Sequence, residues 1–338
     1  IMVDKIKVSV CMITYNHEKY LRQALVSVLT QNTNYNYEII IGDDVSNDGT
    51  REILKEYELK YPKLIKVIYR IENIGATRNL ADCIKNSSGK YISILEGDDY
   101  WISDKKLQLQ SDFLDSNLNF STCFSACQMV DKNGNPITIL PTFNFKKPRH
   151  TLLDLIEQDS FMATSTIMFR ANLFDYFPEV FYSLRNGCDW TLNVLNAEHG
   201  DIAYIDELVS VYRSASGEDA WTSKPIYHIY KDAIKINLAF NKYFDHKYNT
   251  IFNNKITNYH YLISKDYLTY NKYIQSYKFV LKSFKYGINK KVLRQFFSIL
   301  LVDTPKAALN YIRLKTRNRF PSLQKNYRKI KKHLIFQD

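Results

Sequence analysis

Three carboxylates follow the apolar segment "YISIL" almost at once: Glu96, Asp98 and Asp99, with Gly97 between the first two. Like charges this close raise one another's pKa unless a cation or a hydrogen-bond donor lies between them. Mg²⁺ and Mn²⁺ prefer oxygen ligands, and they commonly combine one or two carboxylates with water and phosphate oxygens. A solvated acidic turn that begins the next helix is the alternative, because Asp and Glu are favoured there. The pattern indicates either a divalent-cation site or a helix-capping turn.

A second acidic segment, "IIIGDDVSNDGT", has the same form, because Asp43 and Asp44 directly follow an apolar run. Acids at strand ends accept hydrogen bonds from ribose hydroxyls in nucleotide sites, and either side chain could accept one from a base N–H or a ribose. Asp, Ser, Asn and Gly are also the ordinary residues of turns and helix N-caps. We expect Asp48, Gly49 and Thr50 to serve only as such, and both interpretations stay open for the first two acids.

The segment "NIGATRN" adds a cation to these acids. Gly75 permits a tight turn, and Arg78 stands at the start of a helical pattern with a guanidinium able to hold phosphate bidentately. An exposed arginine on a helix surface is the alternative. The case for a common site is stronger if the segments meet at one edge of a sheet.

The surrounding pattern supplies such an edge, because strand-like and helical segments alternate along the first hundred residues. The strand-like segments are residues 6–13, 37–41, 66–69 and 91–95, and helical segments lie near 21–29, 50–59 and 78–86. This order predicts an α/β fold with a mainly parallel sheet covered on both faces. Ligands of such sheets bind beyond the carboxyl ends of the strands. We therefore expect the loops "TYNHE", "GDDVSNDG", "RIENIGATR" and "EGDDYW" to share one site.

The rest of the chain changes character at Pro225. Before it we expect a helix at 105–117, a hairpin at 120–140 turning at "KNGN", and short strands at 164–169 and 202–206. After it Tyr, Lys and Asn dominate, and segments such as 279–288 and 292–301 are helix-like. We predict two domains, residues 1–224 and a helical, basic C-terminal extension of residues 225–338.

Composition narrows the class of protein. The longest apolar runs are too short to span a bilayer, and the N-terminal residues do not resemble a secretory signal, so we expect an intracellular protein. The cysteines lack the spacing of a zinc site and are expected to be reduced and mostly buried. These are Cys11, Cys83, Cys123, Cys127 and Cys188.

Most of the net charge of +11 lies in residues 304–338, which hold ten Lys or Arg and one Asp. Their basic side chains interleave with Tyr, Ile, Leu and Phe, which favours a helix lying on an anionic membrane surface. Nucleic-acid binding uses similar residues and is the less favoured interpretation, and a plain solvated helix is the third.

Taken in order, "VSVCMITYN", "EIIIGDDVSNDGT", "NIGATRN" and "YISILEGDDYW" are similar to the successive signatures of family two glycosyltransferases. The similarity covers residues 6 to about 223, and "TSTIMFR", "GCDWTL" and "IAYIDELVSVYR" resemble the acceptor-facing strand, the catalytic-base helix and the closing strands of that family. The resemblance implies the GT-A fold, an α/β fold with a mainly parallel central sheet.

The resemblance also implies a role for each matching residue. Without it, Asp189 could be only the N-cap of a helix. Thr14 and Tyr15 would line the nucleotide pocket, Asp44 would bind the base, and Asp43 would support that loop. Arg78 would lie near the diphosphate, Asp98 and Asp99 would hold the ribose and the metal, and Asp189 would be the general base. Glu96 would replace the first acid of the usual Asp-x-Asp-Asp motif.

The implied reaction is metal-dependent, inverting transfer of a sugar, with Mn²⁺ or Mg²⁺ as the cofactor. The donor would be a nucleotide-sugar, with a UDP-sugar expected, and the acceptor a hydroxyl of a glycan or lipid-linked glycan in surface-polysaccharide assembly. One departure is at Ala215, near which relatives often carry a His: either that metal contact is missing, or Glu218, Asp219 or only water substitutes for it. The alternative is a non-catalytic nucleotide-sugar-binding or scaffold protein of the same fold.

Overall fold

The structure is a computed structural model that describes residues 5–141, 146–159, 161–214, 225–270, 272–287 and 291–293. The chain divides into two compact units, Ile1–Lys224 and Pro225–Asp338. Each unit is described by itself below.

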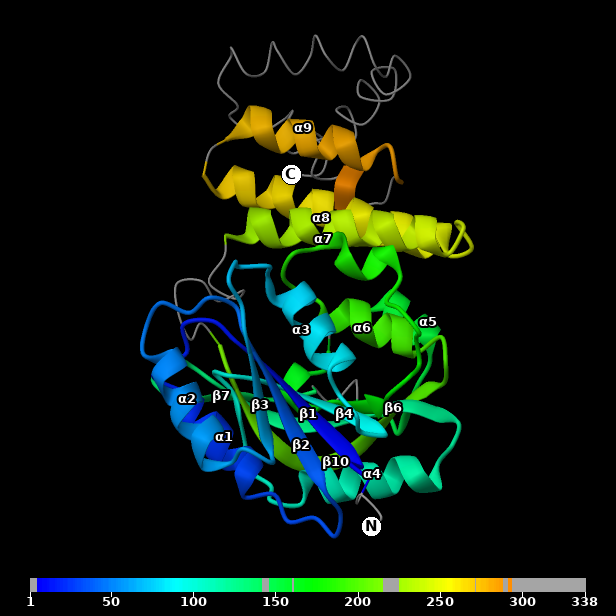
Figure 1. Ribbon diagram of the computed structural model, residues 1–338. Coiled ribbons are helices and arrows are strands. Elements are labelled where there is room, and N and C mark those ends of the chain that lie inside the picture. The colour runs from blue at the N-terminus through cyan, green and yellow to red at the C-terminus, as the bar shows by residue number, and fades with distance from the viewer. Residues whose placement is uncertain are drawn as a thin grey trace, which may run out of the picture. The chain divides into compact units, whose positions relative to one another are not determined.

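The first unit begins with the alternation that the sequence predicts (Figure 1). The first four strands run parallel, and the first three are each followed by a helix, because apolar, β-branched runs alternate with amphipathic segments. The elements are β1 (Val8–Thr14), α1 (Leu21–Leu29), β2 (Tyr37–Asp43), α2 (Thr50–Lys60), β3 (Ile65–Tyr69), α3 (Ala76–Lys85) and β4 (Tyr91–Glu96).

The second half of this unit is less regular. Its elements are β5 (Tyr100–Trp101), α4 (Lys106–Ser116), β6 (Phe120–Val130), β7 (Pro136–Leu140), β8 (Arg149–His150), α5 (Leu152–Glu157), η2 (Thr164–Thr166), β9 (Met168–Arg170), η3 (Glu179–Ser183), α6 (Asp189–Asn196) and β10 (Asp201–Arg213). The predicted helix at 105–117 and the hairpin of β6 and β7 are confirmed.

Two predicted strands differ from the structure. Residues 164–166 form a 3₁₀ turn and only Met168–Arg170 is a strand, because the Thr166 hydroxyl donates to the Ala163 carbonyl at 2.7 Å. Such local side-chain hydrogen bonds compete with a sheet ladder. The strand expected at 202–206 extends to Arg213, because irregularities in its pairing with β6 absorb the polar residues in its middle.

The sheet is mixed, with strand order β3-β2-β1-β4-β9-β6-β10-β5. β1 pairs in parallel with β2 on one side and β4 on the other. β9 is antiparallel to both β4 and β6, and β10 runs parallel to β6. Because the chain leaves β1 toward one neighbour and returns to the other, the end of β1 is the switch point where such sheets bind ligands.

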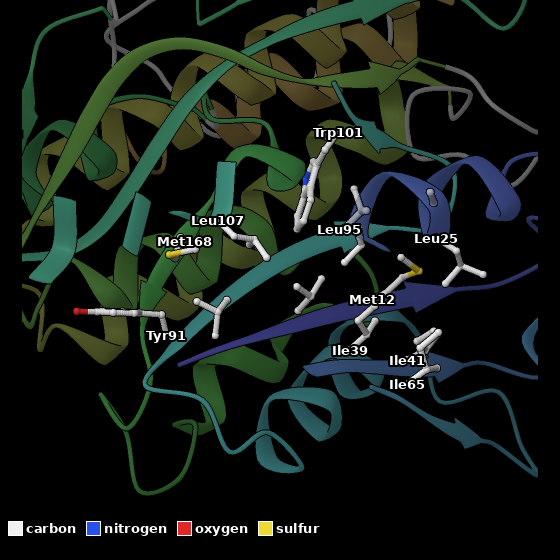
Figure 2. Close-up of a cluster of buried hydrophobic side chains, with 14 of the residues drawn as sticks. Met12, Leu25, Ile39, Ile41, Ile65, Tyr91, Leu95, Trp101, Leu107 and Met168 are labelled. Atoms are coloured by element: carbon white, nitrogen blue, oxygen red, sulfur yellow. The ribbon is translucent and has the colours of Figure 1, made fainter. Parts of the chain in front are cut away.

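One hydrophobic cluster joins the sheet to α1, α2 and α4 (Figure 2). Val8, Val10 and Met12 of β1 enter it together with Leu25 of α1 and Leu107 of α4, and all are fully buried. Each such side chain contributes about 1.5–3 kcal/mol on burial. The packing fixes the carboxyl ends of β1, β2 and β4 as one rigid edge.

The opposite face of the sheet is covered by α3 and α6 (Figure 1). Successive residues of a strand point to opposite faces, so Cys11 points away from the cluster of Met12. Its sulfur lies 3.2 Å from the Ser87 hydroxyl, just beyond α3. All five cysteines are free and buried, as the sequence predicts.

The second unit is helical where the structure describes it. It contains α7 (Ile226–Tyr243), α8 (Asn249–Thr269) and α9 (Tyr273–Ser283), and Tyr277 and Val280 of α9 lie in its core. Within the described part of the chain, no helix combines the length and apolar character needed to cross a bilayer. The predicted helix at 292–301 falls almost entirely outside the described residues, and the basic segment 304–338 falls wholly outside them.

Candidate active site at the carboxyl ends of the parallel strands

The end of β1 holds the two acidic loops beside each other. The backbone N–H of Asp44 donates to the carbonyl of Thr14 at 3.0 Å, and that of Gly97 donates to the carbonyl of Ile13 at 3.0 Å. The loops that follow β2 and β4 therefore flank the last two residues of β1. The expectation that these loops share one edge of the sheet is confirmed.

The loop after β1 is tied to the loop after β2. The N–H of Asn16 donates to the Ser46 hydroxyl and the N–H of His17 donates to the Thr50 hydroxyl, both at 2.9 Å. Asn16 and Val45 have φ of 55° and 68°. Positive φ is costly for a β-branched residue such as Val45, and strain of this kind concentrates at functional sites.

Asp43 is compensated inside the protein. It is fully buried, and its carboxylate accepts from the Arg51 guanidinium at 2.5 Å and from the Ser46 N–H at 3.2 Å. Arg51 also donates to the carbonyl of Arg70 at 2.7 Å, beyond the end of β3. The ion pair holds the loops after β2 and β3 together.

Asp44 joins the same loops through its side chain. One carboxylate oxygen accepts from the Ile74 N–H and the other from the Gly75 N–H, each at 2.8 Å. Gly75 has φ of +85°, and a Cβ there would lie 2.7 Å from the Arg185 carbonyl oxygen, so the turn needs glycine. Each oxygen retains a lone pair, which leaves Asp44 able to accept a further bond from a base.

The start of α3 is capped by protein atoms. The N–H of Ala76 donates to the Asn186 side chain at 2.9 Å, and that of Thr77 donates to the Arg185 carbonyl at 3.1 Å. Arg78 is exposed in the first turn, with its guanidinium 5.0 Å from the centre of the Tyr182 ring. Phosphate binding at this point would therefore use the Arg78 side chain rather than the helix N–H groups.

The acidic turn after β4 is compensated only in part. Glu96 ends β4, and the N–H of Asp99 donates to its carbonyl at 3.0 Å. Asp99 is buried, and its Oδ1 accepts from the Arg213 N–H at 2.9 Å. Its Oδ2 is buried without a hydrogen-bond partner among the described residues. An unsatisfied buried carboxylate oxygen is costly and indicates a missing ligand.

Burial and crowding act together on the charges of this turn. Burial, then Asp98 and Asp189, raise the pKa of Glu96 to about 8. Burial, then Asp98 and Glu96, raise the pKa of Asp99 well above its ordinary value against the opposing effect of Arg213. The same acids and burial raise the pKa of Tyr212 on β10. A bound cation would relieve this crowding.

Asp189 belongs to the same group of charges. It is the first residue of α6, and Cys188 occupies the N-cap position, so the interpretation of Asp189 as an N-cap is wrong. Its charge contributes to the raised pKa of both Glu96 and Tyr212, so Asp189 lies within electrostatic range of the acidic turn. The next residue is anchored, because the Trp190 indole N–H donates to the Leu155 carbonyl at 3.0 Å.

Arg213 is a site residue that the sequence did not reveal. Its guanidinium donates to the Asp98 carbonyl and, at 2.6 Å, to the side chain of Gln23. It also lies 4.7 Å from the ring centres of both Tyr20 and Tyr100. Arg51 and His17 were missed as well, and the only sequence signal was their position in or beside the strand-end loops.

The acidic turn fits a divalent cation only as a partial ligand set. Across the residues that the structure describes, no three His, Cys, Asp or Glu side chains are grouped so that they alone could hold a metal. Mg²⁺ and Mn²⁺ need only one or two carboxylates when phosphate and water supply the other ligands. Asp98 and Asp99 meet that requirement, and a cation would also compensate the buried Asp99 Oδ2, which has no hydrogen-bond partner among the described residues.

The fold and the charged strand ends define a protein of the GT-A type. A family profile described as Glycosyl transferase family 2 matches residues 9–177, which is half of the chain. The chain therefore belongs to this family, as the resemblance of its motifs implied.

Relatives with similar sequences match part of the chain. The chain is 33% identical over 206 residues to the uncharacterized protein Rv1520 of Mycobacterium tuberculosis, covering 61% of this chain and 58% of Rv1520. It is 37% identical over 131 residues to the putative teichuronic acid biosynthesis glycosyltransferase TuaG of Bacillus subtilis, covering 38% of this chain and 50% of TuaG. The chain thus spans about half the length of these relatives.

Solved structures share the fold. TarS of S. aureus, residues 1–349 in complex with UDP-GlcNAc, has a TM-score of 0.59 at 20% identity, over 96% of this chain and 92% of that one. The mannosyltransferase PcManGT of Pyrobaculum calidifontis, in complex with GDP-Man and Mn²⁺, has a TM-score of 0.51 at 12% identity, over 94% and 88%. At these identities the likeness shows the fold alone.

Proposed function

We propose that this protein is an inverting glycosyltransferase that moves a sugar from a nucleotide-sugar to a hydroxyl of a glycan. The observation that carries the proposal is the buried, partly unsatisfied turn of Glu96, Asp98 and Asp99 beside the loops that follow β1 and β2, with Asp189 within electrostatic range of this turn. Such a group can supply both a cation site and a base. Membership of glycosyl transferase family 2 supports the same reaction class.

The donor is proposed to be a UDP-sugar. Thr14 ends β1 beside Asp44, and Tyr15 follows it. The Asp44 carboxylate is held by the backbone of residues 74 and 75 and keeps lone pairs for a base. Asp43 supports this loop through Arg51. TarS binds UDP-GlcNAc and PcManGT binds GDP-Man, so nucleotide-sugars are bound by proteins of this fold.

A divalent cation, Mn²⁺ or Mg²⁺, is proposed to bind at the acidic turn. Asp98 and Asp99 would hold it, and Asp98 would also reach the donor ribose. The cation would supply positive charge against the charge that grows on the departing diphosphate. Arg78, exposed at the start of α3, would bind the same diphosphate. Glu96 would be at most a weak ligand of this cation.

Asp189 is proposed to be the general base. Inversion requires a carboxylate to take the proton from the acceptor hydroxyl as that oxygen attacks the sugar. Asp189 stands at the start of α6 and interacts electrostatically with Glu96 of the acidic turn, so base and cation site lie together. The acceptor hydroxyl would enter between them.

The acceptor is proposed to be a glycan or lipid-linked glycan of a surface polysaccharide. TuaG is described as a putative teichuronic acid biosynthesis glycosyltransferase, and it shares 37% identity over 131 residues with this chain. Work on a lipid-linked acceptor fits a cytoplasmic protein held at the inner face of the membrane through residues 304–338, which lie outside the described residues. Nucleic acid is not a proposed partner.

Asp189→Asn tests the proposal. Turnover of UDP-sugars with Mn²⁺ should fall by about 10²–10⁴-fold, because the base is lost, while UDP affinity stays unchanged. Asp175→Asn, an exposed Asp in the same unit, is the control and should retain full turnover. A wild-type protein that binds nucleotide-sugars but transfers none, over a broad donor and acceptor panel, would instead support a binding or scaffold role.

A further inference from the structure

His17 reaches the acidic turn from the loop after β1. Its Nε2 lies 3.9 Å from Asp98 Oδ2, and the two side chains are 22% and 18% exposed. This separation is too long for a hydrogen bond. Neighbouring ligands of one octahedral Mg²⁺ or Mn²⁺ are about 3.0 Å apart and opposite ligands about 4.2 Å apart, since each is about 2.1 Å from the cation. The separation of 3.9 Å lies between these values, so one cation can contact both atoms after a side-chain movement of less than about 1 Å.

Buried polar atoms without partners gather at this point. Thr14 Oγ1, His17 Nδ1 and Asp99 Oδ2 are buried and have no hydrogen-bond partner among the described residues. Thr14 and Asp99 are only 2% and 1% exposed. A Cβ built on Gly97 would lie 2.8 Å from both Thr14 Oγ1 and His17 Nδ1, so these atoms press on the acidic turn. Of these atoms, Asp99 Oδ2 belongs to the acidic turn itself, and it is the unsatisfied oxygen that a cation beside Asp98 would compensate.

The backbone of His17 is held independently of its side chain. Its N–H donates to the Thr50 hydroxyl at 2.9 Å, and its carbonyl accepts from the N–H groups of Tyr20 and Leu21 at 2.9 Å. The imidazole is therefore presented from a fixed point in the chain. Replacing the ring leaves these backbone bonds in place.

We propose that His17 Nε2 is a further ligand of this divalent cation, on the side of Asp98, with the donor diphosphate and water completing its coordination. The inference rests on the proposed function, because it needs a nucleotide diphosphate at the site. Imidazole nitrogen suits transition metals, whereas Mg²⁺ favours oxygen. His17 therefore makes the site selective for Mn²⁺ over Mg²⁺.

The experiment measures the coordination of the metal directly. Full-length protein is loaded with MnCl₂ and UDP, and pulsed electron paramagnetic resonance detects coupling between Mn²⁺ and ¹⁴N. Wild type should show imidazole coupling, and His17→Ala should lose it and bind Mn²⁺ at least about tenfold more weakly in the presence of UDP. Affinity for Mg²⁺ with UDP should change less. His199→Ala, an exposed His of the same unit, should behave as wild type.

The outcomes separate this inference from the proposed function. Mn²⁺ binding with UDP but without ¹⁴N coupling in wild type overturns the role of His17 and leaves the transferase proposal standing. Coupling that persists in His17→Ala, or an unchanged Mn²⁺ affinity, also overturns it. Failure of the wild type to bind Mn²⁺ with UDP overturns both the inference and the proposed cation site. A lower melting temperature of metal-free His17→Ala with unchanged Mn²⁺ affinity assigns His17 a structural role only.

Discussion

The acids at the end of β2 and those at the end of β4 occupy neighbouring parts of one sheet edge, yet their surroundings differ. Asp43 is paired with Arg51, and both oxygens of Asp44 accept backbone N–H groups. Asp99 keeps a buried oxygen without a partner among the described residues, and burial with neighbouring acids raises the pKa of Glu96 to about 8. The first loop is complete in the protein alone, and the second is not.

This difference distinguishes residues that build a site from residues that bind its ligand. A buried charge must be paired or hydrogen-bonded, and the protein does this at β2 with its own groups. At β4 one buried oxygen of Asp99 has no such group among the described residues, and this is where we propose that a cation binds. The acidic residues after β2 and after β4 therefore have different roles, although their sequences are similar. Replacing Asp by Asn should mainly lower stability after β2 and mainly lower activity after β4.

The largest expected effect is a loss of activity without a loss of stability. Asp99→Asn should lower turnover by about 10²–10³-fold, because it removes a proposed ligand of the cation whose charge would stabilise the leaving diphosphate. It should leave the melting temperature of the metal-free protein unchanged or raised, because one of three crowded carboxylates is gone. Activity assays and thermal unfolding measure the two quantities.

Asp43→Asn is the matched variant at β2. It should lower the free energy of unfolding by about 2–4 kcal/mol, because Arg51 loses its buried partner. If Asp99→Asn destabilised the metal-free protein as much as Asp43→Asn, the two loops would not differ as we describe.

A pH profile should show a smaller effect of the same origin. The native pKa of Glu96 is about 8 against an ordinary 4.5, so the folded protein binds a proton that the unfolded chain lacks between these values. The stability from this proton is full below pH 4.5 and is lost as the pH rises through 8. Melting temperatures of the metal-free protein should fall over this range, and less so in Glu96→Gln.

Because Lys106 also titrates, the melting temperatures must be compared over a limited range of pH. Burial lowers its pKa from 10.5 to about 7, so its contribution makes stability rise between those values, opposite in sign to Glu96. Scans between about pH 5 and 7 keep Lys106 largely protonated in both states. An equal slope in wild type and Glu96→Gln would contradict the assignment to Glu96.

The smallest expected effect comes from replacing Gly97 by alanine, and Gly49 is the matched control. A Cβ at Gly97 would lie 2.8 Å from Thr14 Oγ1 and 3.0 Å from Thr14 Cβ, whereas one at Gly49 would meet only the side chain of Glu18. Gly97→Ala should therefore weaken UDP–Mn²⁺ binding by about tenfold or less, roughly 1.4 kcal/mol. Gly49→Ala should leave it unchanged. Calorimetric titration measures both, and equal losses would remove this distinction between the loops.

The sequence predicts the fold of the first unit well because its signals are local. Apolar runs such as residues 91–95 and stripes such as that of α1 reveal strand and helix without knowledge of neighbours. Strand-end acids then mark the sheet edge. The 3₁₀ turn at Thr164–Thr166 was missed because a hydroxyl hydrogen bond, rather than the apolar pattern, decided the local structure.

Whether each acid is paired inside the protein could not be predicted, because its hydrogen-bond partners are distant in sequence. Asp44 receives N–H groups from Ile74 and Gly75, and Asp99 receives one from Arg213. Even Arg51, eight residues after Asp43, gave no sign of its ion pair. The sequence located the charges, whereas their pairing depends on tertiary contacts that only the folded chain makes.

The contact between Arg213 and the acidic turn has a consequence for the order of folding. Arg213 ends β10, the last strand of the first unit, and β10 lies between β6 and β5 in the sheet. β5, which follows the acidic turn directly, pairs with β10. On the ribosome, the turn at residues 96–99 is made more than a hundred residues before the strand that holds it. Contacts of such long range form late, so in a nascent chain the proposed cation site is complete only when β10 enters the sheet.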